Sequence, residues 1–208
     1  MAEMEELMQK MAELAEKHSP KPSDMNRNLE EITENLLKKI DIEQMQVLTP
    51  TVFLYHFDYA EGEGEMRIGI LEIPNLEDTV EGRVEQFYHI GKGWAEQGPR
   101  LPLYIFFLVE TWMGSALAGK LPSQQENRVE GVMVTGMAVD RNMHTMRIFK
   151  TTRNEENVMQ LEELTTIKVE DAKPESKPVM LSRFFDGYFD VLEARYAGSR
   201  QAGSRIIH

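Results

Sequence analysis

The segment YIFFLVETWMG, residues 104–114, constrains the fold more than any other part of the chain. Successive side chains of a β-strand point to opposite faces of the sheet. One face of this segment carries Tyr104, Phe106, Leu108, Glu110 and Trp112. The other face carries Leu103, Ile105, Phe107 and Val109. Because both faces are apolar for most of the length, we expect a central strand covered on both sides, by the third or last helix and by the N-terminal segment.

Glu110 is the only charged residue within this apolar segment. A buried carboxylate without a partner costs several kcal/mol, so a protein keeps one for chemistry or for a fixed partner. The structural interpretation is a strand-end carboxylate that meets water or an arginine such as Arg128 or Arg147. The functional interpretation is a catalytic or ligand-orienting group.

Two amphipathic helices are predicted before residue 50. The apolar stripe of the first consists of Met4, Leu7, Met11 and Leu14, with Met8 beside it; that of the second consists of Met25, Leu29, Ile32, Leu36 and Ile40. Pro20 and Pro22 separate the helices, and Ser23 or Asp24 is the expected N-cap of the second. Each stripe needs cover from the rest of the chain or from another chain. Docking on the chain's own domain is the first interpretation, and self-association is the alternative, because the 4-7-11-14 spacing also matches heptad a and d positions over two heptads.

In the remaining chain the strand patterns come in consecutive groups, and single helices follow each group. TVFLYHFDYA and MRIGILEI predict a hairpin; a third helix follows, with Asp78 as N-cap and Glu81 three residues later, and ends at Gly98 and Pro99. VEGVMVTGMAV, TMRIFKTT and VMQLEELTTIKV predict strands, although the Leu-Glu-Glu-Leu core of the last also fits a helix. A final helix begins near Val179 and ends at Gly198.

This order predicts an α+β fold. We expect a mainly antiparallel sheet of about five or six strands with helices packed on one face, preceded by an N-terminal helical hairpin or arm. The expected organisation is an amphipathic arm over 1–49, an α+β domain over 50–197 and a flexible tail over 198–208.

The amino-acid composition makes several classes of function less favoured. The 208 residues include 23 Lys plus Arg against 35 Asp plus Glu, a formal net charge of −12, which disfavours nucleic-acid binding. The absence of cysteine removes disulfides and thiolate chemistry. No signal peptide or membrane-spanning run is evident, so a cytoplasmic protein without a membrane partner is expected.

Histidines and carboxylates supply the candidate catalytic and metal-ligating groups. His56 and Asp58 stand two apart on one strand face and, with Glu110, would form the His and carboxylate set of a non-haem metal site. The alternative is that His56 is a polar position on the wetter face of the hairpin. His89 lies in the third helix beside Gly91 and Gly93, where the glycines end the helix or admit a close neighbour, because G-x-G is outside its strand-to-helix context here.

The region from Tyr104 to Arg153 resembles a group of uncharacterised bacterial and phage-encoded proteins. The shared layout is ETWM, then LPSQQENRVEGVMV with its Pro-Ser loop and Arg-x-Glu, then a variable hairpin. The resemblance implies that Glu110, Trp112, Arg128 and Glu130 form one structural or functional unit, and it implies no activity. The loop GSALAGKLPSQQENR within it has a length typical of functional or mobile loops.

Two main functions remain open at this point, beside a third, nucleic-acid association through the tail ARYAGSRQAGSRIIH, which has three arginines and no acidic residue and otherwise reads as a flexible segment. The first is a non-enzymatic protein without a cofactor, which assembles with itself or binds another protein through its helical arm and acidic surface. The 14 methionines favour it, because Met-rich surfaces adapt to partners. The second is a small hydrolase or metal-dependent enzyme that uses Glu110 with His56 or His89.

Overall fold

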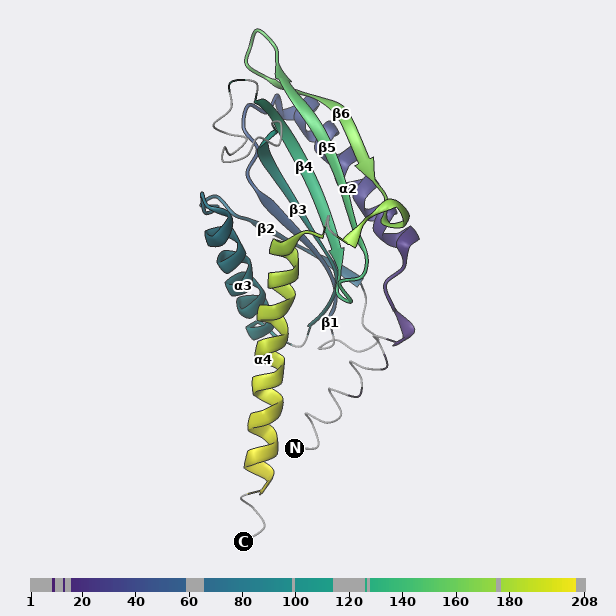
Figure 1. Cartoon of the computed structure of the whole chain (residues 1–208), viewed down its shortest axis with the longest axis vertical. Coiled ribbons are helices and arrows are strands. Elements are labelled where there is room, and N and C mark those ends of the chain that lie inside the picture. Colours follow the sequence, from purple (N-terminus) through teal and green to yellow (C-terminus); the bar gives the residue numbers. More distant parts are fainter. Residues whose placement is uncertain are drawn as a thin grey trace.

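Figure 1 shows the chain as a computed structural model, which describes residues 9, 13, 16–58, 66–98, 100–113, 126, 128–174 and 177–204. Side chains are described up to residue 195. The elements are α2 (Pro22–Glu43), β1 (Thr51–Asp58), β2 (Met66–Glu72), α3 (Val80–Glu96), β3 (Arg100–Met113), β4 (Val129–Ala138), β5 (His144–Arg153), β6 (Met159–Ile167), the short 3₁₀ helix η2 (Val169–Asp171) and α4 (Val179–Ser204).

The strands form one six-stranded sheet in the order β2-β1-β3-β4-β5-β6, and every neighbouring pair is antiparallel. This confirms the predicted α+β class and its antiparallel sheet. The VMQLEELTTIKV segment forms strand β6 and not a helix.

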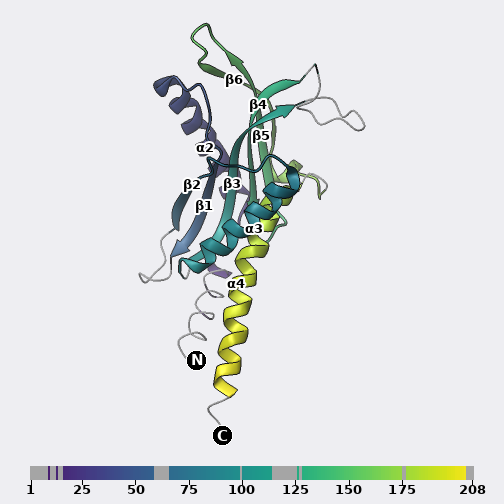
Figure 2. The same cartoon turned by 90° about the vertical axis from the view of Figure 1, so that its left-hand side faces the viewer.

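Helices cover both faces of the sheet, as Figures 1 and 2 show. α2 lies on one face, over β4, β5 and β6, whereas α3 and α4 lie together on the other. The expectation of helices on one face only is therefore wrong. The expectation that β3 is covered on both sides is confirmed.

Strand β3 supplies side chains to both apolar cores. Tyr104, Phe106 and Leu108 join the core under α2, while Ile105, Phe107 and Val109 join the core under α3 and α4. Leu103 belongs to the α2 core and not to the other set, because the β1–β3 register shifts between Tyr55 and His56. All seven side chains are buried. Moving each of them from water into the core stabilises the fold by roughly 1.5–3 kcal/mol.

The predicted stripe of α2 is confirmed, since its five members are buried against the sheet. The second helix of the expected arm thus shares one core with the strands. Its N-cap is Lys21, without a capping side chain, and neither Ser23 nor Asp24 caps it. Pro22 opens the helix, where its missing N–H costs nothing. The first predicted helix lies largely outside the described residues.

Two helix boundaries also differ from the expected ones. Thr79, not Asp78, is the N-cap of α3, and its Oγ1 accepts a hydrogen bond from the Gly82 N–H at 3.0 Å. α4 continues past Gly198 to Ser204, so the predicted tail begins within a helix.

α3 and α4 cross in close contact at two glycines. Gly91 of α3 faces the backbone carbonyl oxygen of Phe184, and Gly187 of α4 faces that of Tyr88. A methyl group at either position would overlap that oxygen. Gly91 therefore admits a close neighbour, which is one of the two roles expected for it.

We predict opposite effects on stability from two alanine substitutions in α3. Gly91→Ala forces the helices apart and should lower the free energy of unfolding by about 1–3 kcal/mol. Gly93→Ala, where nothing lies within 4 Å of the new Cβ, should raise it by roughly 0.5–1 kcal/mol through helix propensity. Urea denaturation measures both. Equal effects of the two substitutions would contradict the close crossing.

Candidate functional site

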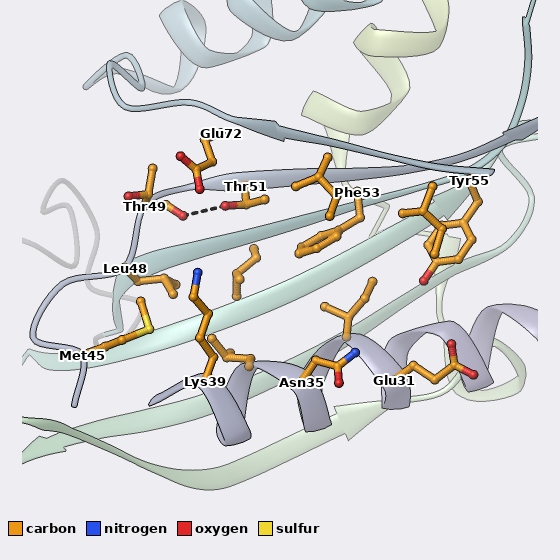
Figure 3. A pocket seen from close by; sticks show the side chains of 15 residues that line it. Glu31, Asn35, Lys39, Met45, Leu48, Thr49, Thr51, Phe53, Tyr55 and Glu72 are labelled. Atoms are coloured by element: carbon orange, nitrogen blue, oxygen red, sulfur yellow. Dashed lines mark hydrogen bonds between the residues drawn. The ribbon is translucent and has the colours of Figure 1, made fainter. Parts of the chain in front are cut away.

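A groove with an apolar floor runs between α2 and the β1–β2 end of the sheet (Figure 3). Its volume is about 370 Å³. The groove exists because α2 lies over β4, β5 and β6 and leaves the same face of β1 and β2 without a helix among the described residues. It is lined by Glu31, Ile32, Asn35, Leu36, Lys39, Met45, Leu48, Thr49, Thr51, Phe53, Tyr55, Ile68, Ile70, Glu72 and Leu108.

The floor of the groove is aromatic and aliphatic. The rings of Phe53 and Tyr55 project from β1 towards α2. Ile68 and Ile70 of β2 extend the floor to the edge of the sheet, where they are 51% and 65% exposed. Burial raises the pKa of Tyr55 to about 12, and the Glu31 charge acts in the same direction. Its hydroxyl is therefore neutral at physiological pH.

Polar side chains form the rim of the groove. Glu31, Asn35 and Lys39 come from α2, and Glu72 comes from β2 on the opposite side. The Lys39 amine lies 3.9 Å from the Glu43 carboxylate in an exposed pair. An apolar floor inside a polar rim is typical of a site that binds an amphipathic partner.

The loop 44–50 closes one end of the groove, and Met45, Leu48 and Thr49 line it there. Three strands hold this loop in place. The Leu48 N–H donates to Glu110 Oε1 of β3 at 2.8 Å, the Met159 N–H of β6 donates to the Met45 carbonyl at 2.8 Å, and the Arg153 guanidinium of β5 donates to the Gln46 carbonyl.

Glu110 thus acts as an anchor for this loop. Burial raises the pKa of its carboxyl, and the nearby Glu130 charge adds to that effect, while the Leu48 N–H and Arg153 oppose it. The arginine whose charge acts on Glu110 is Arg153. The Arg128 guanidinium lies over the Trp112 ring, 4.7 Å from its centroid, and Arg147 binds Glu163.

The structure brings together the other three residues of the predicted unit. Trp112 is directly opposite Glu130 in the β3–β4 register, and Arg128 stacks on the Trp112 ring. The Glu130 carboxylate binds Arg153. Trp112 is 43% exposed, so the cluster lies at the surface beside the anchored loop. The segment 114–125, expected to be functional or mobile, lies outside the described residues.

The His56 and Asp58 pair lies near the opposite end of β1 in a cationic setting. His56 is buried with its ring 5.3 Å from that of Trp94, in an edge-to-face arrangement, and burial lowers its pKa. Asp58 has Arg67 and Arg100 each 3.9 Å away. Among the described residues no group of three or more His, Asp or Glu side chains has the geometry of a metal site.

The structure does not bring Glu110 together with either candidate histidine. His56 pairs with Pro102, and Glu110 lies eight residues further along β3. The register shift takes one residue out of the advance, so the separation is roughly 23 Å at about 3.3 Å per residue. The Glu110 and His56 side chains also lie on opposite faces of the sheet. Glu110 points towards Leu48, and His56 points towards Trp94. His89 lies on the exposed surface of α3, 3.3 Å from Glu85.

Comparison with known proteins places the chain in no family. No protein-family model, no curated protein and no solved structure matches it. Within the described part of the chain, no helix has the length and apolarity that crossing a membrane requires.

We predict that stability depends on pH through Glu110. Its folded-state pKa is raised, so the folded state holds this proton more tightly, and stability falls as pH rises from the ordinary glutamate pKa through the folded value. Glu110→Gln keeps an acceptor for the Leu48 N–H without the charge. Its stability relative to the wild type should therefore increase with pH across that window in urea denaturation.

Two further variants complete this test. Glu110→Ala leaves the Leu48 N–H without its acceptor and should be about 1–3 kcal/mol less stable than Glu110→Gln throughout the pH range. Glu163→Gln is the control of opposite sign, because hydrogen bonds from Thr166 and Arg147 lower the Glu163 pKa. If Glu110→Gln were as unstable as Glu110→Ala at pH 7, a role for the Glu110 charge beyond anchoring would follow.

Proposed function

We propose that this protein is a non-enzymatic assembly module, in which the groove of one copy binds the apolar stripe of residues 4–14 from a second copy. The observation that carries the proposal is the groove itself. Its apolar floor continues onto exposed isoleucines of β2, and the polar side chains of α2 and Glu72 surround it. Such a surface gains free energy when an amphipathic segment covers it.

The dimensions and pattern of the stripe fit the groove. Met4, Leu7, Met11 and Leu14 follow the spacing of a helix that presents one apolar face, which is how grooves of this kind recognise helices. If residues 4–14 form a helix, they would span about 15 Å, and the α2 wall from Glu31 to Lys39 spans about 12 Å.

Charge opposes this association, so apolar contact has to drive it. Each copy carries a formal net charge of −12, and Glu31 and Glu72 stand at the rim. The stripe itself lies among Glu5, Glu6 and Glu13. Salt screens repulsion between exposed charges, and therefore assembly should strengthen with ionic strength. Complexes held by opposite charges show the reverse dependence.

The alternative function is a hydrolase or metal-dependent enzyme that uses Glu110 with His56 or His89. The separation of these side chains counts against it, because a catalytic pair has to lie within hydrogen-bond or ligand distance. Glu110 is also engaged by the Leu48 N–H. The described residues that line the groove include Tyr55, Glu31 and Lys39 but no histidine.

We predict that Leu7→Glu disrupts assembly whereas Gln9→Glu does not. Both substitutions make the chain more negative by one charge, but only Leu7 belongs to the stripe, and the Gln9 side chain is exposed. Loss of one buried leucine costs about 1.5–3 kcal/mol, or roughly a tenfold to hundredfold rise in the dissociation constant. Light scattering over a concentration series measures the mass of each variant.

The proposal fails if wild type and Leu7→Glu have the same mass at every concentration. It also fails if both substitutions weaken assembly equally, because the effect would then come from charge. Addition of about 0.5 M salt should raise the assembled fraction of the wild type. A fall in that fraction would point to charge pairing and away from the groove.

A further inference from the structure

Strand β2 has the features of an open pairing edge. It is the first strand of the sheet, and among the described residues nothing pairs with its outer side (Figure 2). Six of its seven residues are exposed, including Met66, Ile68, Ile70 and Leu71. The strand contains no proline or lysine and pairs with β1 without a register shift. Natural proteins normally protect such an edge, because it recruits further strands.

The opposite edge of the sheet is protected. Strand β6 carries adjacent carboxylates at Glu162 and Glu163, and its pairing with β5 contains a register shift between Ile148 and Phe149. Charges and irregular pairing are both devices that prevent strands from adding to an edge. The contrast between the two edges indicates that the open state of β2 serves an interaction.

We propose that β2 pairs antiparallel with β2 of a second copy, about a two-fold axis that passes through Gly69. In this symmetric pair Ile68 of each copy lies opposite Ile70 of the other, Arg67 lies opposite Leu71, and Met66 lies opposite Glu72. The interface is isologous, so each contact occurs twice. The two sheets become one continuous sheet of twelve strands.

The register follows from the faces of the strand. A two-fold axis perpendicular to the sheet keeps each face on its own side, so a residue on the α2 side has to oppose another on that side. Ile68, Ile70 and Glu72 line the groove on the α2 side, and Met66 shares that side by alternation. Gly69 is the midpoint of Met66–Glu72, and pairing about it uses the full length of the strand.

The side chains of β2 are compatible with this pairing. Like charges directly opposite each other destabilise a strand pair, and here Arg67 and Glu72 each face an apolar residue. The two isoleucine pairs are of the aliphatic, β-branched kind that suits a sheet surface. At the axis the Trp94 indole fills the space beside Gly69 where a Cβ would stand, so no side chain of β2 obstructs the other copy on that side.

This inference rests on the assembly role proposed above in one respect. A strand of seven residues is about 23 Å long, and its edge alone covers much less than the roughly 800 Å² per partner of a stable interface. Pairing at β2 brings the two grooves side by side on one face of the joined sheet, which is the arrangement that an exchange of residues 4–14 between the copies would use. The two surfaces together form the interface.

Engineered cysteines test the register in the full chain. The chain has no cysteine of its own, so every disulfide is assignable. Directly opposed residues of antiparallel strands have Cα atoms about 4.5–5.5 Å apart, within the range of about 4.4–6.8 Å that a disulfide needs. Ile68→Cys and Ile70→Cys chains, mixed and mildly oxidised, should form a disulfide-linked dimer. Either chain alone should form at least about tenfold less, because position 68 does not oppose itself.

Leu164→Cys on β6 is the matched control, since Leu164 and Ile68 are both 51% exposed. It should yield no more dimer than random collision gives. The two-fold pairing would be overturned if the mixture, each chain alone and Leu164→Cys gave equal yields of dimer. It would also be overturned if the mixture stayed entirely monomeric. A dimer formed by Ile68→Cys alone would place the axis elsewhere and also contradict the proposed register.

The same cysteine pair in the Leu7→Glu background separates the two proposals. If the disulfide forms in both backgrounds at unchanged rate and Leu7→Glu leaves the mass unchanged, β2 pairing stands and docking of residues 4–14 fails. If Leu7→Glu lowers the mass and no disulfide forms in either background, docking stands and β2 pairing fails. If both proposals hold, Leu7→Glu slows disulfide formation at a fixed protein concentration without changing which chains react.

Discussion

The burial of both faces of β3 is the constraint on which the remaining structure depends. Its side chains enter two separate cores, so each face of the sheet needs a helical layer. α2 provides one layer, and α3 with α4 provides the other (Figure 1). The two layers differ in extent. α3 and α4 contact each other closely through Gly91 and Gly187, whereas α2 is a single helix and leaves β1 and β2 uncovered among the described residues. The groove is the result of this asymmetry.

The sequence predicted those features that depend on periodicity. The stripe of α2, the two apolar faces of β3 and the hairpin of β1 and β2 each follow from one segment read alone. The helical layers on two faces were missed, because the side of the sheet to which a helix crosses depends on packing between distant segments. Leu103 was assigned to the wrong core for a related reason. The register shift beside it leaves no recognisable pattern in the sequence.

The candidate site was even harder to predict from the sequence than the fold. Glu110 attracted attention as a lone charge, but its partner is the backbone N–H of Leu48, a donor that every non-proline residue carries and that no motif identifies. The groove depends on the lateral position of α2, which no single segment encodes. The available signal was MRIGILEI, whose apolar residues at 66, 68 and 70 would be unusual on a face that meets only water.

The anchored loop 44–50 also determines how the groove can be entered. Bonds from β3, β5 and β6 join this loop to the sheet at three points, so α2 cannot swing away from β1 without breaking them. The groove is consequently preformed. In the assembly proposed above, an incoming segment would meet this fixed surface with no opening step before contact. Encounter and desolvation, and not a rearrangement of the fold, would then determine the rate of association.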